Sequence, residues 1–280
     1  MRTANWEDYK VIATGNGEKL ERWGDVILLR PDPQVIWGGT PLSKHKNINA
    51  RYSRSESGGG AWEILKPFPS EWKISWQGLK FIVKPMGFKH TGIFPEQAVN
   101  WEKMMELIKN ANREIKILNL FAYTGGASVA CASVGGKVTH VDASKGMVER
   151  AKQNASLNGI NTIRYIVDDC KKFIEREIRR GQTYDAIIMD PPSYGRGPSG
   201  EMWKIEDNLF EFVKLTKKVL SDKPLFVLIN SYTTGLQPGV IANILKLVFG
   251  KESVEADEIG VPTEEGIILP CGASGWKTWN

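Results

Sequence analysis

Residues 115–142, IKILNLFAYTGGASVACASVGGKVTHVD, constrain the fold of this chain more than any other stretch. The stretch contains four successive elements: an apolar run at 115–121, a glycine-bearing turn at 123–126, a run of small residues at 127–133 and a second strand candidate at 137–141. A continuous apolar run bounded by turn residues is typical of a strand covered on both faces, as in a parallel sheet. The stretch therefore predicts a strand–turn–helix–strand unit of an α/β sheet whose second strand stops on an acid, Asp142.

The turn in this unit favours a nucleoside cofactor that carries no pyrophosphate. Gly125 and Gly126 are adjacent, whereas a dinucleotide-binding turn spaces its glycines as G-x-G-x-x-G. Asp142, at the end of the next strand, is placed to accept hydrogen bonds from a ribose diol. S-adenosylmethionine has the adenosine but no phosphate, so the pattern favours it over NAD. The alternative is an ordinary α/β turn without a ligand.

The chain continues as alternating helices and strands. We expect helices at 145–158, 170–180, 206–220 and 239–249, and strands at 162–167, 184–189 and 225–230. Two further strand candidates, 253–261 and 266–279, would form a final hairpin. The alternation predicts a Rossmann-like, seven-stranded α/β sheet whose last strand is antiparallel.

The first part of the chain has a different pattern. Short β-like segments at 9–14, 26–30, 72–76 and 79–84 are separated by turn residues, which predicts a small, mostly β domain at 1–87 before an α/β domain at 88–280. Residues 42–60 read as a long surface loop with the cations Lys44, Lys46, Arg51 and Arg54, together with His45 and Tyr52. Cations around an aromatic ring can bind phosphates and stack a base, although a merely solvated loop remains open. A helix starting near Pro95 and running to about residue 110 would join the two parts.

Composition limits the class of protein. The 280 residues are 41% hydrophobic and 25% charged, with a net charge of +5, which is ordinary for a soluble globular chain. No apolar run approaches the roughly 18 residues of a membrane span, and the N-terminus lacks a signal peptide pattern. The three cysteines (Cys131, Cys170, Cys271) are widely spaced. We therefore expect a cytoplasmic protein without disulfides, a metal site or a membrane partner.

Two further strand ends carry acids. Asp168 and Asp169 follow the strand at 162–167, and one carboxylate there, for which Asp169 is favoured, can accept from the adenine amino group. An N-cap for the following helix is the alternative, and one residue can serve both purposes.

The motif at 190–194 is the most specific signal in the chain. Asp190, Pro191, Pro192, Ser193 and Tyr194 follow the buried strand AIIM. The two prolines fix an extended turn and remove two N–H donors, so that carbonyls and the carboxylate remain as acceptors for an amino group or for an N–H edge of a base. Tyr194 can stack on a flipped or single-stranded base.

Together, NLFAYTGG, VDAS, the acids at 168–169 and DPPSY resemble class I S-adenosylmethionine-dependent methyltransferases, over roughly residues 85–280. Within that class the chain is similar to bacterial 23S rRNA large-subunit methyltransferases that act on cytosine C5 or guanine N7. The resemblance implies specific roles for matched residues. Thr124, Gly125 and Gly126 would face the methionine end of the cofactor, Asp142 the ribose, and Asp169 the adenine with Asp168 as its neighbour. Asp190 to Tyr194 would lie at the acceptor base, while Phe94 and Gln97 would close over the cofactor. Tyr123, Ala143, Ser144 and Asp190 are further candidates for cofactor binding.

The chain departs from that group in two places. The rRNA enzymes usually carry an N-terminal PUA domain, which residues 1–85 do not resemble. The cytosine-C5 enzymes have a cysteine where this chain has Asn230-Ser231-Tyr232. We therefore expect an enzyme that methylates a base nitrogen of RNA, ribosomal RNA above all. A small-molecule or protein methyltransferase, and a non-catalytic RNA-binding protein that retains the fold, are the alternatives.

Overall fold

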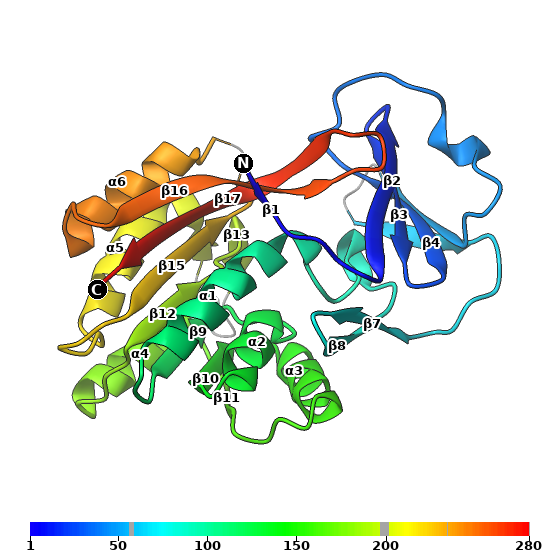
Figure 1. Ribbon diagram of the computed structural model, residues 1–280. Helices are drawn as coiled ribbons and strands as arrows, with labels where there is room; N and C mark the ends of the chain where they lie inside the picture. Colours follow the sequence, from blue (N-terminus) through cyan, green and yellow to red (C-terminus); the bar gives the residue numbers. More distant parts are fainter. Residues whose placement is uncertain (56–58, 197–201, 234, 280) are drawn as a thin grey trace. The chain divides into compact units, whose positions relative to one another are not determined.

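The computed structural model describes residues 1–55, 59–196, 202–233 and 235–279. The chain forms two compact units (Figure 1): unit 1 comprises Met1–Val99 and Gly260–Cys271, and unit 2 comprises Asn100–Ile259 and Gly272–Asn280. Unit 1 thus continues past residue 87 and takes in a segment close to the C-terminus. The expected division of the chain into domains at 1–87 and 88–280 stays a prediction.

Most of unit 2 is built on one large sheet with strand order β11-β10-β9-β12-β15-β17-β16. The two-residue strand β1 (Arg2–Thr3) belongs to unit 1. Neighbours from β11 to β15 are parallel, and β17 runs antiparallel to β15. The Rossmann-like α/β prediction with an antiparallel last strand is confirmed. The strands are β9 (Lys116–Leu120), β10 (Lys137–Asp142), β11 (Arg164–Val167), β12 (Ala186–Met189), β15 (Phe226–Ser231), β16 (Val254–Pro262) and β17 (Ile268–Thr278).

Helices cover both faces of this sheet (Figure 1), which is why its central strands are largely buried. All four residues of β12 and all six of β15 are buried. Side chains of α4, α5 and α6 pack against these strands in one hydrophobic core that includes Phe173, Phe212 and Leu245. The helices are α1 (Ala98–Asn110), α2 (Gly126–Ser133), α3 (Lys145–Leu157), α4 (Cys170–Arg179), α5 (Ile205–Lys217) and α6 (Pro238–Phe249).

Unit 1 is mostly β. Its main sheet has the order β2-β3-β4-β5-β6, and a separate hairpin is formed by β7 and β8. The strands are β2 (Tyr9–Gly15), β3 (Glu18–Trp23), β4 (Val26–Pro31), β5 (Ala50–Arg54), β6 (Gly60–Ile64), β7 (Trp72–Trp76) and β8 (Leu79–Val83). The four predicted strands are present, whereas β3, β5 and β6 were not predicted.

The expectation of a loop throughout 42–60 is wrong. The segment contains a short 3₁₀ turn, η1 (Leu42–Lys44), and strand β5, while residues 56–58 lie outside the described part of the chain. Tyr52 is only 4% exposed and its ring packs edge-on against Trp62 at 5.4 Å. Because its ring is inside the sheet's packing, Tyr52 is not accessible to stack on a base.

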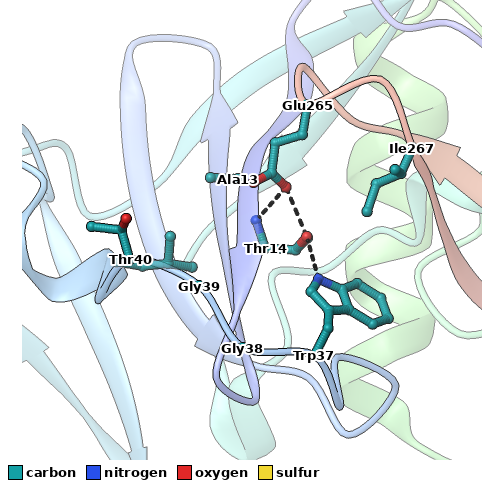
Figure 2. Close-up of a pocket in the computed structure, with 9 residues that line it drawn as sticks. Ala13, Thr14, Trp37, Gly38, Gly39, Thr40, Glu265 and Ile267 are labelled. Atoms are coloured by element: carbon teal, nitrogen blue, oxygen red, sulfur yellow. Dashed lines mark hydrogen bonds between the residues drawn. The ribbon is translucent and has the colours of Figure 1, made fainter.

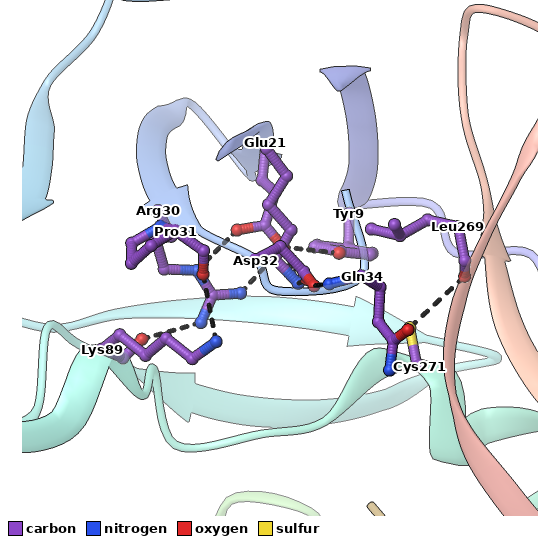
Figure 3. A network of polar contacts seen from close by, with 10 residues as sticks. Tyr9, Glu21, Arg30, Pro31, Asp32, Gln34, Lys89, Leu269 and Cys271 are labelled. Atoms are coloured by element: carbon purple, nitrogen blue, oxygen red, sulfur yellow. Dashed lines mark hydrogen bonds and ion pairs between the residues drawn. The ribbon is translucent and has the colours of Figure 1, made fainter. Parts of the chain in front are cut away.

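A buried charge cluster lies in the core of unit 1 (Figure 3). The Glu21 carboxylate is fully buried and accepts two hydrogen bonds from the Arg30 guanidinium, at 2.6 and 2.8 Å, and one from the Tyr9 hydroxyl at 2.7 Å. Lys19 bridges Glu21 and Asp32 at 3.5 and 3.1 Å. These cations hold the pKa of Glu21 at about 2 although desolvation acts in the opposite direction. The cluster explains why charged residues occupy the middle of a strand.

Among the described residues, no helix combines the length and the apolar character that crossing a membrane requires.

Candidate active site

Four parallel strands of unit 2 end at one edge of the sheet, and the predicted site segments follow these ends. In the sheet register, Leu120 at the end of β9 lies opposite Val141 of β10 and Met189 of β12. Val167 at the end of β11 lies opposite Asp142. The structure therefore brings together the turn after β9, the acid that ends β10, the acids after β11 and the turn after β12. Ligands of open α/β sheets bind at this carboxyl edge.

The turn between β9 and α2 has a strained backbone. Phe121, Tyr123 and Gly125 have φ angles of +56°, +50° and +84°. The left-handed region is uncommon for aromatic residues, and such strain is concentrated at ligand sites. Position 125 requires glycine for two reasons. Its φ angle lies in the left-handed region, and a Cβ atom there would lie 2.9 Å from the Cβ of Ala151.

Hydrogen bonds from neighbouring elements hold this turn. The Ala122 amide donates to the Val141 carbonyl at 3.1 Å, and the buried Asn154 side chain of α3 donates to the Thr124 carbonyl at 2.9 Å. Thr124 is fully buried, and α2 begins at the buried Gly126. These bonds hold the turn so that it presents the N-terminus of α2 at the carboxyl edge.

Asp142 joins this turn to the end of β10. Its Oδ2 accepts the Tyr123 amide at 2.9 Å and its Oδ1 accepts the Ser144 amide at 2.8 Å. Burial raises the pKa of Asp142, and the two amide bonds act in the opposite direction. Each carboxylate oxygen has a second lone pair, so two hydroxyl donors such as those of a ribose can still be accepted. Ala143 and Ser144 follow in the exposed segment before α3.

A buried polar chain beneath the turn was not predicted from the sequence. The Asn119 amide donates to the Ser128 hydroxyl at 2.9 Å, and that hydroxyl lies 3.0 Å from Nδ1 of His140. His140 is fully buried on β10, and desolvation lowers its pKa to about 4. A Cβ at Gly125 would lie 3.6 Å from the ring, so His140 supports the strained turn from below. A lone histidine in an apolar strand gives no local signal of this role.

Asp168 and Asp169 have structural partners. The Asp169 side chain caps α4 by accepting the Lys172 amide at 2.9 Å, which is the alternative considered for it from the sequence. Asp168 pairs with Arg176 and accepts the Asp169 amide at 2.9 Å. Both residues remain partly exposed at the carboxyl edge, and their contact with an adenine stays a prediction.

The segment 190–194 leaves β12 as an extended turn. The Asp190 amide lies 3.4 Å from the Leu120 carbonyl, Pro191 is buried, and Tyr194 is 55% exposed. The Pro192 carbonyl accepts the Trp203 indole N–H at 2.6 Å. One of the carbonyls expected to be free for a substrate is therefore engaged within the protein.

An aromatic cluster beside this turn was also missed. Trp203, on the short strand β14 (Met202–Lys204), lies 5.3 Å from Phe121 and 5.4 Å from Phe212 between ring centroids. β14 pairs with β13 (Tyr194–Arg196), so the residues that follow the proline turn are held by a small hairpin. Trp203 thus connects the turn after β12 with the turn after β9. Trp203 is separated along the chain from both turns, so the sequence alone does not indicate this contact.

The segment after β15 supports the sheet. Asn230 is buried and accepts hydrogen bonds from the Asn100 amide and the Ser274 hydroxyl, at 3.2 and 2.8 Å. Its side chain is therefore part of the core rather than of a substrate site. Thr233 lies next to the acceptor turn, with its hydroxyl 2.6 Å from that of Ser193.

Each of the three cysteines has a raised thiol pKa. Cys131 and Cys170 are buried in unit 2, and burial is the main cause of the shift in both. Cys170 accepts the Phe121 amide at 3.3 Å, which places it behind the strained turn. Cys271 belongs to unit 1 and is partly exposed, and burial is again the main cause. No thiolate forms readily at neutral pH in any of them.

Phe94 and Gln97 also belong to unit 1. The Gln97 amide donates to the Phe94 carbonyl at 3.1 Å at the start of η3 (Pro95–Gln97), and Gln97 is buried. Their closure over a cofactor stays a prediction.

The hydrogen-bond acceptors at the carboxyl edge fit S-adenosylmethionine. Carboxylates end β10 at Asp142 and follow β11 and β12 at Asp168, Asp169 and Asp190. These groups accept hydrogen bonds from hydroxyl and amino groups and attract the positive charge of a sulfonium, whereas they would repel a pyrophosphate. No group of three or more metal-ligating side chains occurs in the described part of the chain.

Comparisons with known proteins relate this chain to methyltransferases. Residues 34–235 match the S-adenosylmethionine-dependent methyltransferase family. A crystal structure of a SAM-dependent methyltransferase from Agrobacterium tumefaciens superposes with a TM-score of 0.91, is 34% identical, and is covered over 92% of its length by 99% of this chain. The methyltransferase SMU.776, solved in complex with SAH, has the same fold at 19% identity, with a TM-score of 0.75 over 98% of this chain and 76% of that one.

Curated relatives match a smaller share of their own length. Ribosomal RNA large subunit methyltransferase K/L of Shewanella frigidimarina is 34% identical over 51% of this chain and 20% of that protein. The protein of the same name from Alteromonas mediterranea is 26% identical over 82% of this chain and 32% of its own length. This chain thus spans between a fifth and a third of these relatives. By its family match and its fold, the chain belongs to the S-adenosylmethionine-dependent methyltransferases and uses S-adenosyl-L-methionine as its cofactor.

Proposed function

We propose that this enzyme methylates a nitrogen of an RNA base, and that the RNA is ribosomal. The relatives named above are ribosomal RNA large subunit methyltransferases, which supports RNA as the substrate class. The net charge of +5 is compatible with a polyanionic partner. The observation that carries the proposal is the turn after β12, where the acid Asp190 and the exposed ring of Tyr194 flank two prolines at the carboxyl edge.

In this proposal the protein binds and orients the acceptor. Bound S-adenosylmethionine supplies a methyl group that is already activated by the sulfonium. Asp190 accepts a hydrogen bond from the amino or imino group of the base, and Tyr194 stacks on its ring. Pro191 and Pro192 keep the turn extended, and Trp203 fixes Pro192 through its indole N–H. Holding the acceptor nitrogen in line is the main contribution that such a site can make.

The cofactor would be held by the residues that the strand ends bring together. Asp142 would accept from the ribose hydroxyls, with Ala143 and Ser144 beside it, and Asp169 would accept from the adenine amino group. The backbone of Tyr123, Thr124, Gly125 and Gly126 would lie against the methionine part. Phe94 and Gln97 would complete the site.

Nitrogen is favoured over cytosine C5 by the state of the cysteines. Carbon 5 is a poor nucleophile until a thiolate adds to the neighbouring carbon, so carbon methylation needs a reactive cysteine. The thiol pKa values of Cys131, Cys170 and Cys271 are all raised, and the buried Asn230 lies in the segment where the cytosine-C5 enzymes have their cysteine. A nitrogen acceptor needs no thiolate.

The test compares Asp190→Ala with Cys271→Ser. Transfer of radiolabel from S-adenosylmethionine is measured on total RNA, on total protein and on a small-molecule extract from cells that lack this protein. We expect label in the RNA fraction, loss of at least a hundredfold in Asp190→Ala, and activity within about twofold of wild type in Cys271→Ser. Label confined to protein or small molecules would replace the RNA assignment. An inactive Cys271→Ser together with a covalent wild-type adduct on RNA would replace the nitrogen assignment.

A further inference from the structure

Unit 1 contains a pocket of about 330 Å³ that the methyl-transfer site does not use (Figure 2). Its walls come from the end of β2, from residues 37–42 and from the tip of the β16–β17 hairpin, all within unit 1. The hairpin tip runs along the edge of β2, where the Glu264 amide donates to the Val11 carbonyl at 2.9 Å. The pocket is thus built from three separate parts of the chain. The lining residues are Ala13, Thr14, Trp37, Gly38, Gly39, Thr40, Leu42, Glu265 and Ile267.

A chain of hydrogen bonds orients the polar side of the pocket. Oε2 of Glu265 accepts both the amide and the hydroxyl of Thr14, each at 2.7 Å. The same Thr14 hydroxyl accepts the indole N–H of Trp37 at 3.1 Å. Thr14 is buried, so one threonine fixes both a carboxylate and an aromatic ring at the pocket wall. Figure 2 shows the three side chains joined in this order.

One oxygen of that carboxylate remains available. Oε2 of Glu265 carries both Thr14 bonds, and the described residues supply no hydrogen bond or ion pair to Oε1. Its sequence neighbour Glu264 differs, because it pairs with Lys10 at 3.6 Å. A carboxylate with one oxygen fixed and the other open is suited to a ligand that donates N–H groups.

The wall opposite the polar side of the pocket contains two glycines, which add no side chain to it. Gly38 and Gly39 do not have left-handed φ angles, and Cβ atoms there would meet only ordinary contacts, at 3.7 Å from Asn16 Oδ1 and from the Thr14 carbonyl. Neither backbone conformation nor packing requires glycine at these positions. The loop is nevertheless well held, since Asn16 donates to the Trp37 and Gly39 carbonyls at 2.9 and 2.8 Å. A flat ligand lying against the loop would explain both glycines.

Exposed cations follow directly on the pocket wall. Leu42 lines the pocket and opens the η1 turn, which ends at the exposed Lys44. Lys46, two residues further, is also exposed. A ligand that places a ring in the pocket and phosphates outside it would meet positive charge at this rim.

We propose that this pocket binds a guanine ring of the RNA substrate, which stacks on Trp37 and donates its N1–H and 2-amino groups to Glu265. The inference rests on the proposed function, because it makes the pocket a second contact for the same RNA. Guanine is the common base whose Watson–Crick edge presents two adjacent donors, which can converge on the open Oε1 of Glu265, whereas adenine and cytosine present an acceptor beside one amino group. A volume of about 330 Å³ accommodates a purine, and the indole of Trp37 offers a ring on which a base can stack.

The test is a titration that does not depend on methyl transfer. The Trp37 indole N–H is followed by nitrogen–proton NMR, and its signal is assigned with Trp37→Phe. Guanosine, inosine and adenosine monophosphates are the probes, together with single-stranded RNA hexamers that contain one guanine or none. Glu265→Gln keeps an oxygen for Thr14 but offers an NH₂ group to the ring. Glu264→Gln, on the same hairpin tip, is the matched control.

We expect guanosine monophosphate to shift the Trp37 signal and to bind at least tenfold more weakly to Glu265→Gln, while Glu264→Gln stays within twofold of wild type. Inosine, which lacks the 2-amino group, and adenosine should bind more weakly than guanosine. If the hexamer with guanine binds more tightly than the mononucleotide, the source is RNA; if the mononucleotide binds equally well, a free nucleotide is the occupant and the RNA source is overturned. Equal titration by guanosine and adenosine monophosphates, or an unchanged Glu265→Gln, would overturn the assignment. Guanine binding without RNA methylation would refute the proposed function and leave the pocket assignment standing.

Discussion

The amide of Tyr123 donates to Oδ2 of Asp142 at 2.9 Å, and this bond ties the strained turn after β9 to the end of β10. The same carboxylate receives the Ser144 amide through its other oxygen. Asp142 therefore shapes the turn and also offers lone pairs at the carboxyl edge. A substitution there changes both the ligand contacts and the backbone that presents them.

We expect Asp142→Ala to weaken S-adenosylmethionine binding by at least tenfold, because it removes charge-assisted hydrogen bonds of about 1.5–3 kcal/mol. Calorimetric titration measures the affinity, and Asp207→Ala, at an exposed position in the first turn of α5, is the control. Because burial raises the pKa of Asp142, affinity should fall on acidification at a higher pH than an ordinary aspartate would give. Unchanged affinity in Asp142→Ala would remove this residue from the cofactor site.

The exposed cations of unit 1 should contribute to RNA binding. Lys44, Lys46 and Arg54 are exposed, whereas Arg51 pairs with Glu18 at 3.3 Å. Replacing the three exposed cations with alanine should make the log–log salt dependence of RNA affinity shallower by about 0.7 for each phosphate that the protein no longer neutralises. Arg51→Ala should change the slope less.

The control for this experiment removes the same charge from unit 2. Lys109, Lys171 and Lys251 are exposed there, and their alanine variant should keep the wild-type slope. Equal effects of both triple variants would mean that net charge alone matters. An unchanged slope in the unit 1 variant would make the segment 44–54 a solvated surface.

The fold of unit 2 was predictable because its signals are local. Strands such as β12, buried on both faces, are apolar throughout, and glycines mark helix ends at Gly159 and Gly181, where φ is +69° and +64°. Strand β3 was missed for the opposite reason. Its sequence, EKLERW, is charged, and only the structure shows that Glu21 and Lys19 point into a buried ion cluster.

The site was predictable only where its residues follow strand ends. Asp142, Asp168 and Asp190 come at the ends of predicted strands and Asp169 follows Asp168, so sheet topology alone brings them to one edge. Trp203 and His140 have no such marker, since their partners lie elsewhere along the chain. The polar residues that flank Tyr52 suggested an exposed ring that could stack on a base. The ring is buried by packing in three dimensions, which the flanking sequence does not indicate.

Loss of Glu21 should destabilise unit 1. In Glu21→Gln the buried Arg30 loses its anion, whereas Lys19 keeps Asp32, and breaking a buried pair costs about 3–5 kcal/mol. Glu18→Gln, on the same strand but partly exposed, should cost less than about 1 kcal/mol. Urea unfolding at neutral pH, followed by signals from unit 1, measures the difference. Equal midpoints for the two variants would show that the cluster contributes little.

The cluster also predicts an acid dependence. The folded pKa of Glu21 is about 2, below its ordinary value of 4.5, so the stabilisation is complete above pH 4.5 and is lost as the pH falls towards 2. Glu21→Gln should lack this part of the acid dependence. An identical acid limb in wild type and variant would contradict the assignment.

His140 should make the stability of unit 2 depend on pH, in a range above that of Glu21. Its folded pKa is about 4 and its ordinary value is 6.5, so between these values the unfolded chain binds a proton that the folded protein excludes. Stability is therefore complete above pH 6.5 and declines as the pH falls to 4, by about 3 kcal/mol at 1.36 kcal/mol for each pKa unit. His140→Gln lowers stability at every pH but should flatten this decline. Unfolding curves recorded from pH 7.5 to 4 measure the slope, and His90→Gln is the parallel variant, because the pKa of His90 is lowered to about 4 within unit 1. Wild-type and His140→Gln stability curves that run parallel across this range would show that the ring beneath the cofactor turn is not kept neutral by burial.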